Sequence, residues 1–370
     1  KKFTMTLIKS ISGIRGTIGG KPHENLTPID IVESTAAYGT WLTNNFKNEK
    51  IKIVIGRDAR ISGEMVENLC IGTLQSLGID VINLGLSTTP TVEIAVPMEN
   101  AHGGIILTAS HNPKEWNALK LLNNKGEFIS AEDGQLLLDI IEKNDFEFCH
   151  VDNIGKVTQN DTYFTKHIEE ILKINKVDVN AIRKAKLKVV VDAVNSTGGL
   201  VLPQLLKTLG CYEVTELYCN PTGEFPHNPE PLPEHLTELS KTVIEANAHI
   251  GIVVDPDVDR LAFVCEDGSM FGEEYTLVAV ADHVLNEEKG NTVSNLSSTR
   301  ALRDITESHG CEYNASAVGE VNVVTLMKKT NAIIGGEGNG GIIFPELHYG
   351  RDALVGIALF LSHFAKKNTS

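Results

Sequence analysis

The sequence predicts an α/β protein made of three similar α/β domains with mixed, largely parallel sheets. Its 370 residues are too many for one ordinary hydrophobic core. Short apolar runs of strand length alternate with helix-like segments, which is typical of sheets covered by helices. The same order of elements occurs three times: a strand, a helix that ends at a glycine, a strand, a helix, and a strand followed by a loop whose side chains could take part in catalysis or binding. We therefore place the domains at residues 1–155, 156–258 and 259–370.

In the first region, helices end at glycines and strands are short and apolar. A Gly-rich stretch over 8–20 is expected to be a loop. The helices and strands expected after it are a helix over 27–44, a strand over 51–56, a helix over 62–77, a strand over 79–84, a short helix from 91 and a strand over 104–107.

The second and third regions follow the same plan. An amphipathic helix over 161–173 opens the second region. Strands over 187–192, 214–218 and 250–254, a helix ending at Leu209 and a Pro-rich loop over 220–231 complete it, and a strand over 261–264 follows the boundary. The third region contains a strand over 292–296, a helix beginning at 297–300, a second helix from 318 and a strand over 331–335.

The composition is that of a globular protein with a small-molecule ligand. Apolar residues make up 42% and charged residues 22%, and the formal net charge is −15. This charge argues against nucleic acid or an anionic membrane as partner, because both are bound through basic patches. A phosphate group could still be bound by a local cluster of cations or by a metal.

Cysteine usage and hydropathy indicate a cytoplasmic protein. The cysteines show no C-x-x-C pair and are expected to be reduced and mostly buried; they are Cys70, Cys149, Cys211, Cys219, Cys265 and Cys311. We expect no signal peptide. The apolar run over 353–361 is shorter than the ~20 residues that a membrane span needs.

Ser110 is the first candidate for chemistry. It follows the predicted strand over 104–107, so we expect it at the carboxyl end of a strand on an exposed loop, where open α/β sheets bind ligands. His111 beside it could help the hydroxyl lose its proton, and Lys120 adds positive charge. The alternative is a polar turn in which Ser110 caps the segment that follows.

The Gly-rich stretch over 8–20 contains one arginine, Arg15. Glycine permits close approach of the backbone to a ligand, and arginine is suited to a bidentate grip on phosphate. The alternative is an ordinary Gly-rich surface loop.

Asp255, Asp257 and Asp259 place three carboxylates at alternate positions directly after an apolar strand. Hard oxygen ligands at this density suit Mg²⁺. Arg260 follows at once and could grip a phosphate oxygen beside the metal.

Three alternatives compete for this acidic loop. An EF-hand calcium loop would place a ligand at Glu266, but it needs glycine where Arg260 stands, and residues 261–264 read as a strand instead of a helix. A phosphotransferase of the haloacid-dehalogenase type would use Asp255 as nucleophile. A merely solvated acidic turn would leave three like charges repelling one another.

The loop over 336–341 supplies one carboxylate and one amide among glycines. Glu337 and Asn339 could bind sugar hydroxyls, and Gly338 and Gly340 would let the sugar come close. The alternative is a flexible turn. His348 and the pair Arg351 and Asp352 could contribute or be surface residues, and we assign them no role.

These motifs resemble those of the α-D-phosphohexomutases, which include phosphoglucomutase, phosphomannomutase and phosphoglucosamine mutase. The resemblance is carried by Thr108-Ala-Ser-His-Asn-Pro113 with Asn117-Ala-Leu-Lys120, and by Asp255-Pro-Asp-Val-Asp-Arg260, in the family's order. It implies similar α/β/α sandwich domains around a central active-site cleft. It also implies a fourth, phosphate-binding domain, which we expect to be absent from this chain.

The resemblance further implies the chemistry. A phosphoryl group on Ser110 would pass to a hexose monophosphate through a bound 1,6-bisphosphate, interconverting hexose 6-phosphate and hexose 1-phosphate. Mg²⁺ would be held by the three aspartates and an oxygen of the phosphorylated Ser110. Arg15, Arg260 and Lys120 would position the phosphoryl group, and Lys120 and His111 are the candidates for proton transfer. Glucose 1,6-bisphosphate would act as activator.

The sugar preference stays open. Glucose or mannose phosphate is the first expectation, and glucosamine 6-phosphate is the alternative within the family. Asn339 stands where the family often has Ser, and Gly341 where it often has His. More distant alternatives are a phosphatase using Asp255 and a phosphosugar-binding protein without turnover. The sequence does not indicate an oligomeric state.

Overall fold

The computed structural model describes residues 5–10 and 13–367. The chain divides into two compact units, which we call unit 1 and unit 2. Unit 1 comprises residues 1–163 together with 222–224, and unit 2 comprises residues 164–221 and 225–370.

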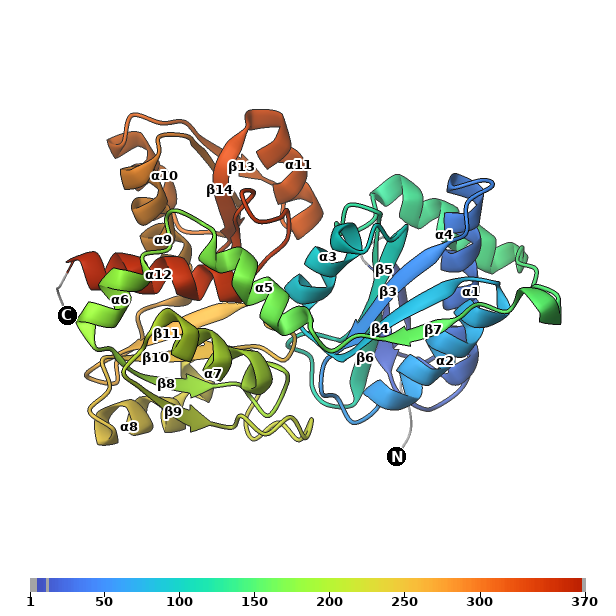
Figure 1. The fold of residues 1–370 in the computed structure, drawn as a ribbon, viewed down its shortest axis with the longest axis horizontal. Coiled ribbons are helices and arrows are strands. Elements are labelled where there is room, and N and C mark those ends of the chain that lie inside the picture. The colour runs from blue at the N-terminus through green and yellow to red at the C-terminus, as the bar shows by residue number, and fades with distance from the viewer. Residues whose placement is uncertain (1–4, 11–12, 368–370) are drawn as a thin grey trace. The chain divides into compact units, whose positions relative to one another are not determined.

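The described part of unit 1 contains a seven-stranded sheet with the strand order β1-β2-β6-β5-β3-β4-β7 (Figure 1). Strand β3 pairs in parallel with β4 and with β5, and β4 pairs in parallel with β7. The pairs β1–β2, β2–β6 and β6–β5 are antiparallel. The elements are β1 (Ile8–Ser10), β2 (Gly13–Thr17), α1 (Pro28–Asn45), β3 (Lys52–Arg57), α2 (Gly63–Ser76), β4 (Asp80–Leu86), α3 (Thr89–Met98), β5 (Gly103–Leu107), β6 (Trp116–Leu122), α4 (Ala131–Lys143) and β7 (Val157–Gln159).

Alternation along the strands buries both faces of this sheet. In β3, Ile53 and Ile55 belong to the core under α1, α2 and α4, whereas Val54 belongs to the core under α3. The helix boundaries follow from local chemistry. Pro28 occupies the first turn of α1, where its missing N–H costs nothing, and Gly78 ends the α2 segment with a positive φ of 78°.

One expectation about unit 1 was wrong in detail, and one strand was not predicted. The Gly-rich stretch expected as a loop contains the antiparallel pair β1 and β2, with Arg15 on β2; residues 11–12 of that stretch lie outside the described residues. The segment over 116–122, for which the sequence predicted no element, forms β6. Strands β2 and β6 pair with each other and so satisfy backbone hydrogen-bonding groups. Because the two strands lie far apart in the sequence, local periodicity does not reveal this pairing.

The described part of unit 2 contains two four-stranded sheets, ordered β11-β10-β8-β9 and β13-β12-β14-β15. In each sheet three strands are parallel and one edge strand, β11 or β15, is antiparallel. The strands are β8 (Lys188–Asp192), β9 (Glu213–Leu217), β10 (Ile250–Val254), β11 (Leu261–Cys265), β12 (Asn291–Asn295), β13 (Tyr313–Ser316), β14 (Ala332–Glu337) and β15 (Gly341–Ile343).

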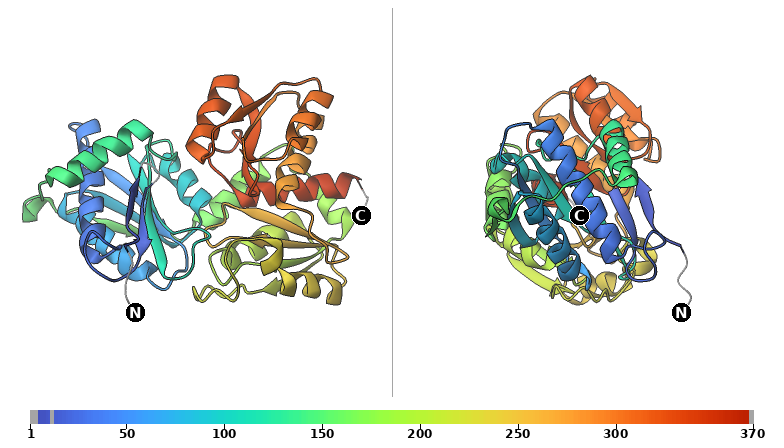
Figure 2. Two further views of the ribbon diagram at one scale, coloured as in Figure 1. Left: turned by 180° about the vertical axis from the view of Figure 1, so that it is seen from behind. Right: turned by 90° about the vertical axis from the view of Figure 1, so that its right-hand side faces the viewer.

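The helices of unit 2 are α5 (Tyr163–Leu172), α6 (Val179–Ala185), α7 (Gly198–Leu209), α8 (Thr237–Glu245), α9 (Glu273–Glu287), α10 (Ala301–Ser308), α11 (Glu320–Thr330) and α12 (Ala353–Lys367). The late apolar run belongs to α12, which runs between the two sheets, as the red helix in Figures 1 and 2 shows. Its side chains share one core with strands of both sheets, Phe360 stacking on Phe263 of β11 at 3.8 Å between ring centres. This shared core explains why α12 is apolar almost all round.

One topological feature recurs in the three sheets of the described residues. Each predicted functional loop leaves a parallel strand and leads directly into an antiparallel neighbour: β5 into β6, β10 into β11, and β14 into β15. The loops therefore occupy equivalent places in three α/β/α domains, as the repeated sequence plan predicted.

The cysteines are less buried than expected. None of the six, all within the described residues, forms a disulfide. Only Cys70 is buried, whereas the other five are half-buried; four of these lie at or within two residues of the ends of β9, β11 and β13. Across residues 5–10 and 13–367, no helix combines the length and the apolar character that crossing a membrane requires.

Candidate active site

Ser110 lies on the connection between β5 and β6. Its backbone has a φ of 49°, in the left-handed region that a non-glycine residue adopts only when its surroundings enforce it. Its N–H donates to Oγ1 of Thr108 at 2.9 Å. Ser110 itself is 7% exposed, so it is less open to solvent than expected, whereas residues 113–115 of the same loop are exposed. His111 Nδ1 lies 3.5 Å from Ser110 Oγ.

The enforcing residue is Arg60, which the sequence reasoning missed. This arginine is 1% exposed, and its guanidinium donates to the backbone carbonyls of four residues around Ser110. The acceptors and distances are Ser110 at 2.5 Å, Asn112 at 2.7 Å, Pro113 at 2.7 Å and Trp116 at 3.0 Å. The planar fork of arginine suits such divergent acceptors, and a lysine could not reach them all.

Asp58 holds Arg60 in place. Its Oδ2 accepts from Arg60 Nε at 3.1 Å and from Thr108 Oγ1 at 2.6 Å, while its Oδ1 accepts from the Arg60 N–H at 3.0 Å. Asp58, Arg60 and Thr108 thus form a buried scaffold for the Ser110 loop. The sequence carries one signal for this scaffold, because the charged residues Asp58 and Arg60 directly follow the apolar strand β3. The same two residues are equally typical of a solvent-exposed turn.

The other predicted cations of unit 1 lie on the antiparallel strands. Arg15 is exposed on β2 and pairs with Ala118 of β6. Lys120 lies on β6 opposite Ile106 of β5, with its amino group 5.8 Å from the centre of the Phe128 ring. Because Ala118 and Lys120 are two residues apart on one strand, the side chains of Arg15 and Lys120 leave the same face of the sheet.

The aspartate loop, residues 255–260, follows β10 in unit 2. Asp255, Asp257 and Asp259 are each at most 1% exposed, and one oxygen from each lies within 4.8 Å of the others. Burial, and then the charges of Asp257 and Asp259, raise the pKa of the Asp255 carboxyl well above its usual value. Such a group of buried carboxylates is the oxygen-rich donor set that a divalent cation neutralises, so the residues fit Mg²⁺.

Backbone contacts fix this loop. Oδ1 of Asp255 accepts the N–H groups of Asp259 at 3.2 Å and Arg260 at 3.1 Å. Ser196 and Thr197 donate their hydroxyls to the Pro256 carbonyl at 2.7 and 3.0 Å. The loop continues into strand β11 instead of a helix, which excludes the helix–loop–helix geometry of an EF-hand.

The end of the Pro-rich segment over 220–231 contacts the aspartate loop through Glu230. Glu230 accepts from Arg260 Nη1 at 3.0 Å, and His227 Nε2 lies 2.9 Å from Oδ2 of Asp192, the last residue of β8. Burial lowers the pKa of His227, but the hydrogen bond and charge of Asp192 outweigh burial, so its pKa is raised. This segment therefore fixes the direction of the Arg260 side chain.

The third loop, residues 338–340, joins β14 to β15 as a tight hairpin. Glu337 pairs with Gly341 across the turn, and Gly341 donates its N–H to Oδ1 of Asn339 at 3.2 Å. Gly340 has a φ of 80°, and a Cβ atom there would lie 1.8 Å from the Leu261 carbonyl oxygen. Only glycine lets this loop pack on the backbone directly after the aspartate loop.

Arg351, to which the sequence reasoning assigned no role, is buried between the two loops of unit 2. It donates to Oδ2 of Asp259 at 2.7 Å and to Oε2 of Glu337 at 2.8 Å, as well as to Oε2 of Glu320 at 2.8 Å. Burial alone would lower the pKa of its guanidinium, but the three carboxylates outweigh burial and raise it, so Arg351 stays charged. Asp352 and His348 face elsewhere, as Asp352 bonds His167 at 2.9 Å and His348 at 3.2 Å.

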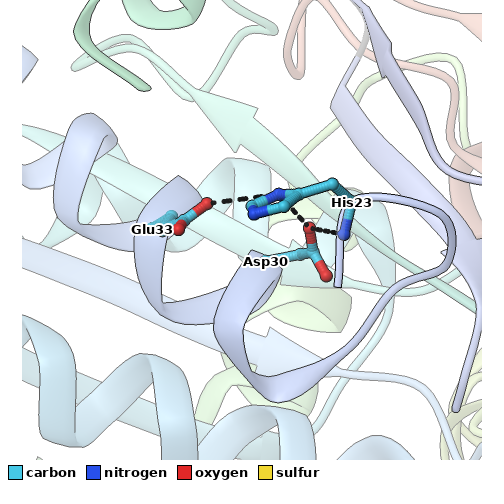
Figure 3. Close-up of side chains that lie close together, drawn as sticks. All are labelled: His23, Asp30 and Glu33. Atoms are coloured by element: carbon cyan, nitrogen blue, oxygen red, sulfur yellow. Dashed lines mark hydrogen bonds and ion pairs between the residues drawn. The ribbon is translucent and has the colours of Figure 1, made fainter. Parts of the chain in front are cut away.

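A second group of metal-type ligands lies at the start of α1, where His23, Asp30 and Glu33 point toward one another (Figure 3). Asp30 Oδ1 accepts the His23 N–H at 3.0 Å, and Oδ2 accepts the Thr27 N–H at 3.1 Å. Both oxygens therefore accept the chain's own donors, and this group caps the helix.

Comparison with known proteins decides the family. The chain matches the phosphoglucomutase/phosphomannomutase alpha/beta/alpha domain I over residues 7–148, domain II over 163–268 and domain III over 272–370. The chain belongs to this family. It is therefore a phosphohexomutase, an isomerase that moves a phosphoryl group between two positions of a hexose.

Individual members of the family agree with this assignment. The chain is 38% identical over 355 residues to a phosphoglucomutase/phosphomannomutase of Thermococcus kodakarensis, covering 95% of this chain and 77% of that protein. It is 33% identical to a probable phosphoglucosamine mutase of Methanopyrus kandleri, covering 95% and 74%. The crystal structure of a phosphoglucomutase/phosphomannomutase family protein from Burkholderia thailandensis matches with a TM-score of 0.84 at 28% identity, covering 96% and 76%.

Proposed function

We propose that this phosphohexomutase interconverts the 6-phosphate and 1-phosphate of glucose or mannose, with Ser110 as the phosphoryl carrier and Mg²⁺ at the aspartate loop. The observation that carries the proposal is the set of three buried carboxylates within 4.8 Å of one another. Three like charges at this spacing favour a bound cation, and in phosphoryl transfer such a cation neutralises the charge of the transferring group.

The proposed reaction has two transfers. In the first, a hydroxyl oxygen of the hexose monophosphate attacks the phosphorus on Ser110; the new O–P bond forms as the bond to Ser110 Oγ breaks. The hydroxyl proton passes to a base, and the product is a hexose 1,6-bisphosphate. After this intermediate reorients, Ser110 Oγ attacks the phosphorus of the other phosphoryl group, and the bond from that phosphorus to the sugar oxygen breaks. The proton of Ser110 Oγ passes to a base and the leaving sugar oxygen receives a proton, which regenerates the phosphorylated serine and releases the isomerised monophosphate.

The scaffold around Ser110 supports its proposed role. With its backbone clamped between Thr108 and Arg60, Ser110 keeps one position through both transfers, which removes an ordering cost from each step. His111, 3.5 Å from the Ser110 hydroxyl, and Lys120 are the proposed proton carriers. Lys120 and Arg15 leave one face of the sheet, so they are proposed to stabilise the phosphoryl charge together.

The aspartate loop supplies the second half of the proposal. Asp255, Asp257 and Asp259 would hold Mg²⁺, which when bound supplies positive charge against the transferring phosphoryl group. Arg260, directed by Glu230, is proposed to bind a phosphoryl oxygen. Glucose 1,6-bisphosphate is the proposed activator, because it can phosphorylate a bare Ser110.

Sugar recognition is proposed for Glu337, Gly338, Asn339 and Gly340. The Glu337 carboxylate is held by Arg351 and by Asn295 Nδ2 at 2.8 Å, and it is 5% exposed. A carboxylate fixed in this way presents its lone pairs to sugar hydroxyls without reorganisation. The glycines on either side of Asn339 let a sugar ring approach the backbone.

Glucosamine 6-phosphate is a second candidate substrate. It is favoured by the relative from Methanopyrus kandleri, which carries the name probable phosphoglucosamine mutase. A 2-amino group would place a cation near the Glu337 carboxylate, whereas glucose would place a hydroxyl there. A panel of glucose, mannose and glucosamine 6-phosphates distinguishes the candidates by relative rate of phosphoryl transfer.

The proposal is tested by a single-turnover transfer. The purified chain is incubated with glucose 1,6-bisphosphate and Mg²⁺, and the glucose monophosphates released are quantified by mass spectrometry. We expect release of up to one equivalent per chain, lost on chelation of Mg²⁺ and lost in Ser110→Ala. Release that continues unchanged in Ser110→Ala contradicts the proposed carrier.

A further inference from the structure

Arg351 joins three elements that the fold brings together in unit 2. Its Nη2 bonds Asp259 of the aspartate loop, its Nη1 bonds Glu337 at the end of β14, and its Nε bonds Glu320 at the start of α11. Asp259 is 0%, Glu337 5% and Glu320 8% exposed. The three donor positions of one planar guanidinium thus serve three buried carboxylates from three different segments, with each distance between 2.7 and 2.8 Å.

The backbone of Arg351 is fixed as firmly as its side chain. Its N–H donates to Oε1 of Glu320 at 3.3 Å, and Arg351 forms a bridge with Ile343 of β15. Glu320 therefore contacts both the main chain and the guanidinium. Arg351 cannot move toward one loop without loosening its contact to the other.

Gly341 makes room for Arg351. A Cβ atom at this position would lie 2.4 Å from Cδ and 3.0 Å from Cγ of Arg351. A larger residue at 341 would therefore displace the arginine from its three carboxylates. The position of the Arg351 side chain therefore requires glycine at 341. This is a physical reason why residue 341, next to the 338–340 loop, has no side chain.

We propose that Arg351 is a positioning residue that couples divalent-cation binding at the aspartate loop to phosphosugar binding at the 338–340 loop. The inference rests on the proposed function, because it takes that function's two ligands as given. A cation at Asp259 fixes the carboxylate that holds Nη2, and a sugar at Glu337 fixes the carboxylate that holds Nη1. Each ligand thus stabilises the arrangement of carboxylates and guanidinium that the other ligand needs, and the coupling is reciprocal.

The coupling is measured by isothermal titration calorimetry in a Ser110→Ala background, so that no phosphoryl transfer occurs. Glucose 6-phosphate affinity is determined without cation and at saturating Mg²⁺. With Arg351 in place, we expect Mg²⁺ to tighten glucose 6-phosphate binding about fivefold or more, and glucose 6-phosphate to tighten Mg²⁺ binding by the same factor. In Arg351→Lys, which keeps the charge but not the fork, we expect the factor to fall below about twofold.

Two further variants separate positioning from general stability. Gly341→Ala keeps every charge but crowds Arg351, so we expect it to reduce the coupling factor as Arg351→Lys does, even if the lysine variant folds poorly. Arg303→Lys is the matched control, because Arg303 pairs only with Asp304 and Glu307 of its own helix among the ion pairs described and should keep full coupling. Circular dichroism and melting establish that each variant is folded before titration.

The outcomes are distinct. Coupling that is present with Arg351 and absent in both Arg351→Lys and Gly341→Ala supports the inference. Both ligands binding with equal coupling in all variants, or binding independently when Arg351 is present, overturns the inference and leaves the proposed function standing. Binding of neither ligand with Arg351 present overturns the proposed function and, with it, the inference.

Discussion

The buried scaffold under Ser110 allows a quantitative prediction for Arg60→Lys. The arginine side chain makes five hydrogen bonds, one to Asp58 and four to backbone carbonyls. A lysine has one compact ammonium group and must abandon at least two of these acceptors. Hydrogen bonds from a charged donor are worth about 1.5–3 kcal/mol each, so we expect a loss of about 3–6 kcal/mol in the free energy of unfolding.

The assay is urea unfolding combined with hydrogen exchange of the amides over 108–116. A loss of this size is a large share of the about 5–15 kcal/mol that stabilises a typical domain. Because four of these five hydrogen bonds hold the Ser110 loop, the amides of this loop should lose their protection against exchange first. The matched control is Arg57→Lys, three residues earlier, whose side chain bonds Glu67 at 3.3 Å and is partly exposed. We expect the control to cost about 1 kcal/mol or less. A cost below about 1 kcal/mol for Arg60→Lys, with unchanged loop exchange, would refute the scaffold.

Three further predictions concern unit 2. Gly340→Ala places a Cβ atom 1.8 Å from the Leu261 carbonyl oxygen, so it should destabilise the chain by at least about 2 kcal/mol more than Gly310→Ala, which has a similar positive φ but open space; equal melting losses would contradict this. Burial lowers the pKa of His363 from 6.5 to about 4, so only the unfolded chain gains a proton as pH falls below 6.5. About 2 kcal/mol of stability should be lost between pH 7 and pH 5, and His363→Gln should remove that part of the loss in urea titrations at both pH values; an unchanged pH slope would count against it. Asp257→Asn should weaken Mg²⁺ binding at least about tenfold in calorimetry, yet raise the melting temperature of the metal-free chain by relieving repulsion, and a metal-free chain of lower stability would show that the three carboxylates are not in conflict.

The sequence predicted the repeated plan and the parallel strands because these depend on local signals. Apolar runs such as that over 250–254, glycine stops such as Gly78 and the capping pair of Thr27 and Pro28 act over a few residues. The antiparallel strands β6 and β15 were missed, since each is defined by its partner strand and not by its own periodicity.

The candidate site shows the same division. Ser110 and the aspartate loop carry motifs that stand in consecutive residues and could be recognised. Arg60 and Arg351 could not be assigned from the sequence, because their acceptors lie about 50 and 14 to 92 positions away along the chain. A buried arginine looks like a surface arginine until the fold shows which carboxylates and carbonyls surround it.

The most direct test of the proposed chemistry is to find where the phosphoryl group resides. The chain is incubated with glucose 1,6-bisphosphate and Mg²⁺, digested, and its peptides are mapped by mass spectrometry before and after hydroxylamine treatment. We predict phosphate on Ser110 that survives hydroxylamine, because a phosphoserine ester is stable to it. Phosphate on Asp255 that hydroxylamine removes would contradict the account, since it would make an acyl phosphate the carrier.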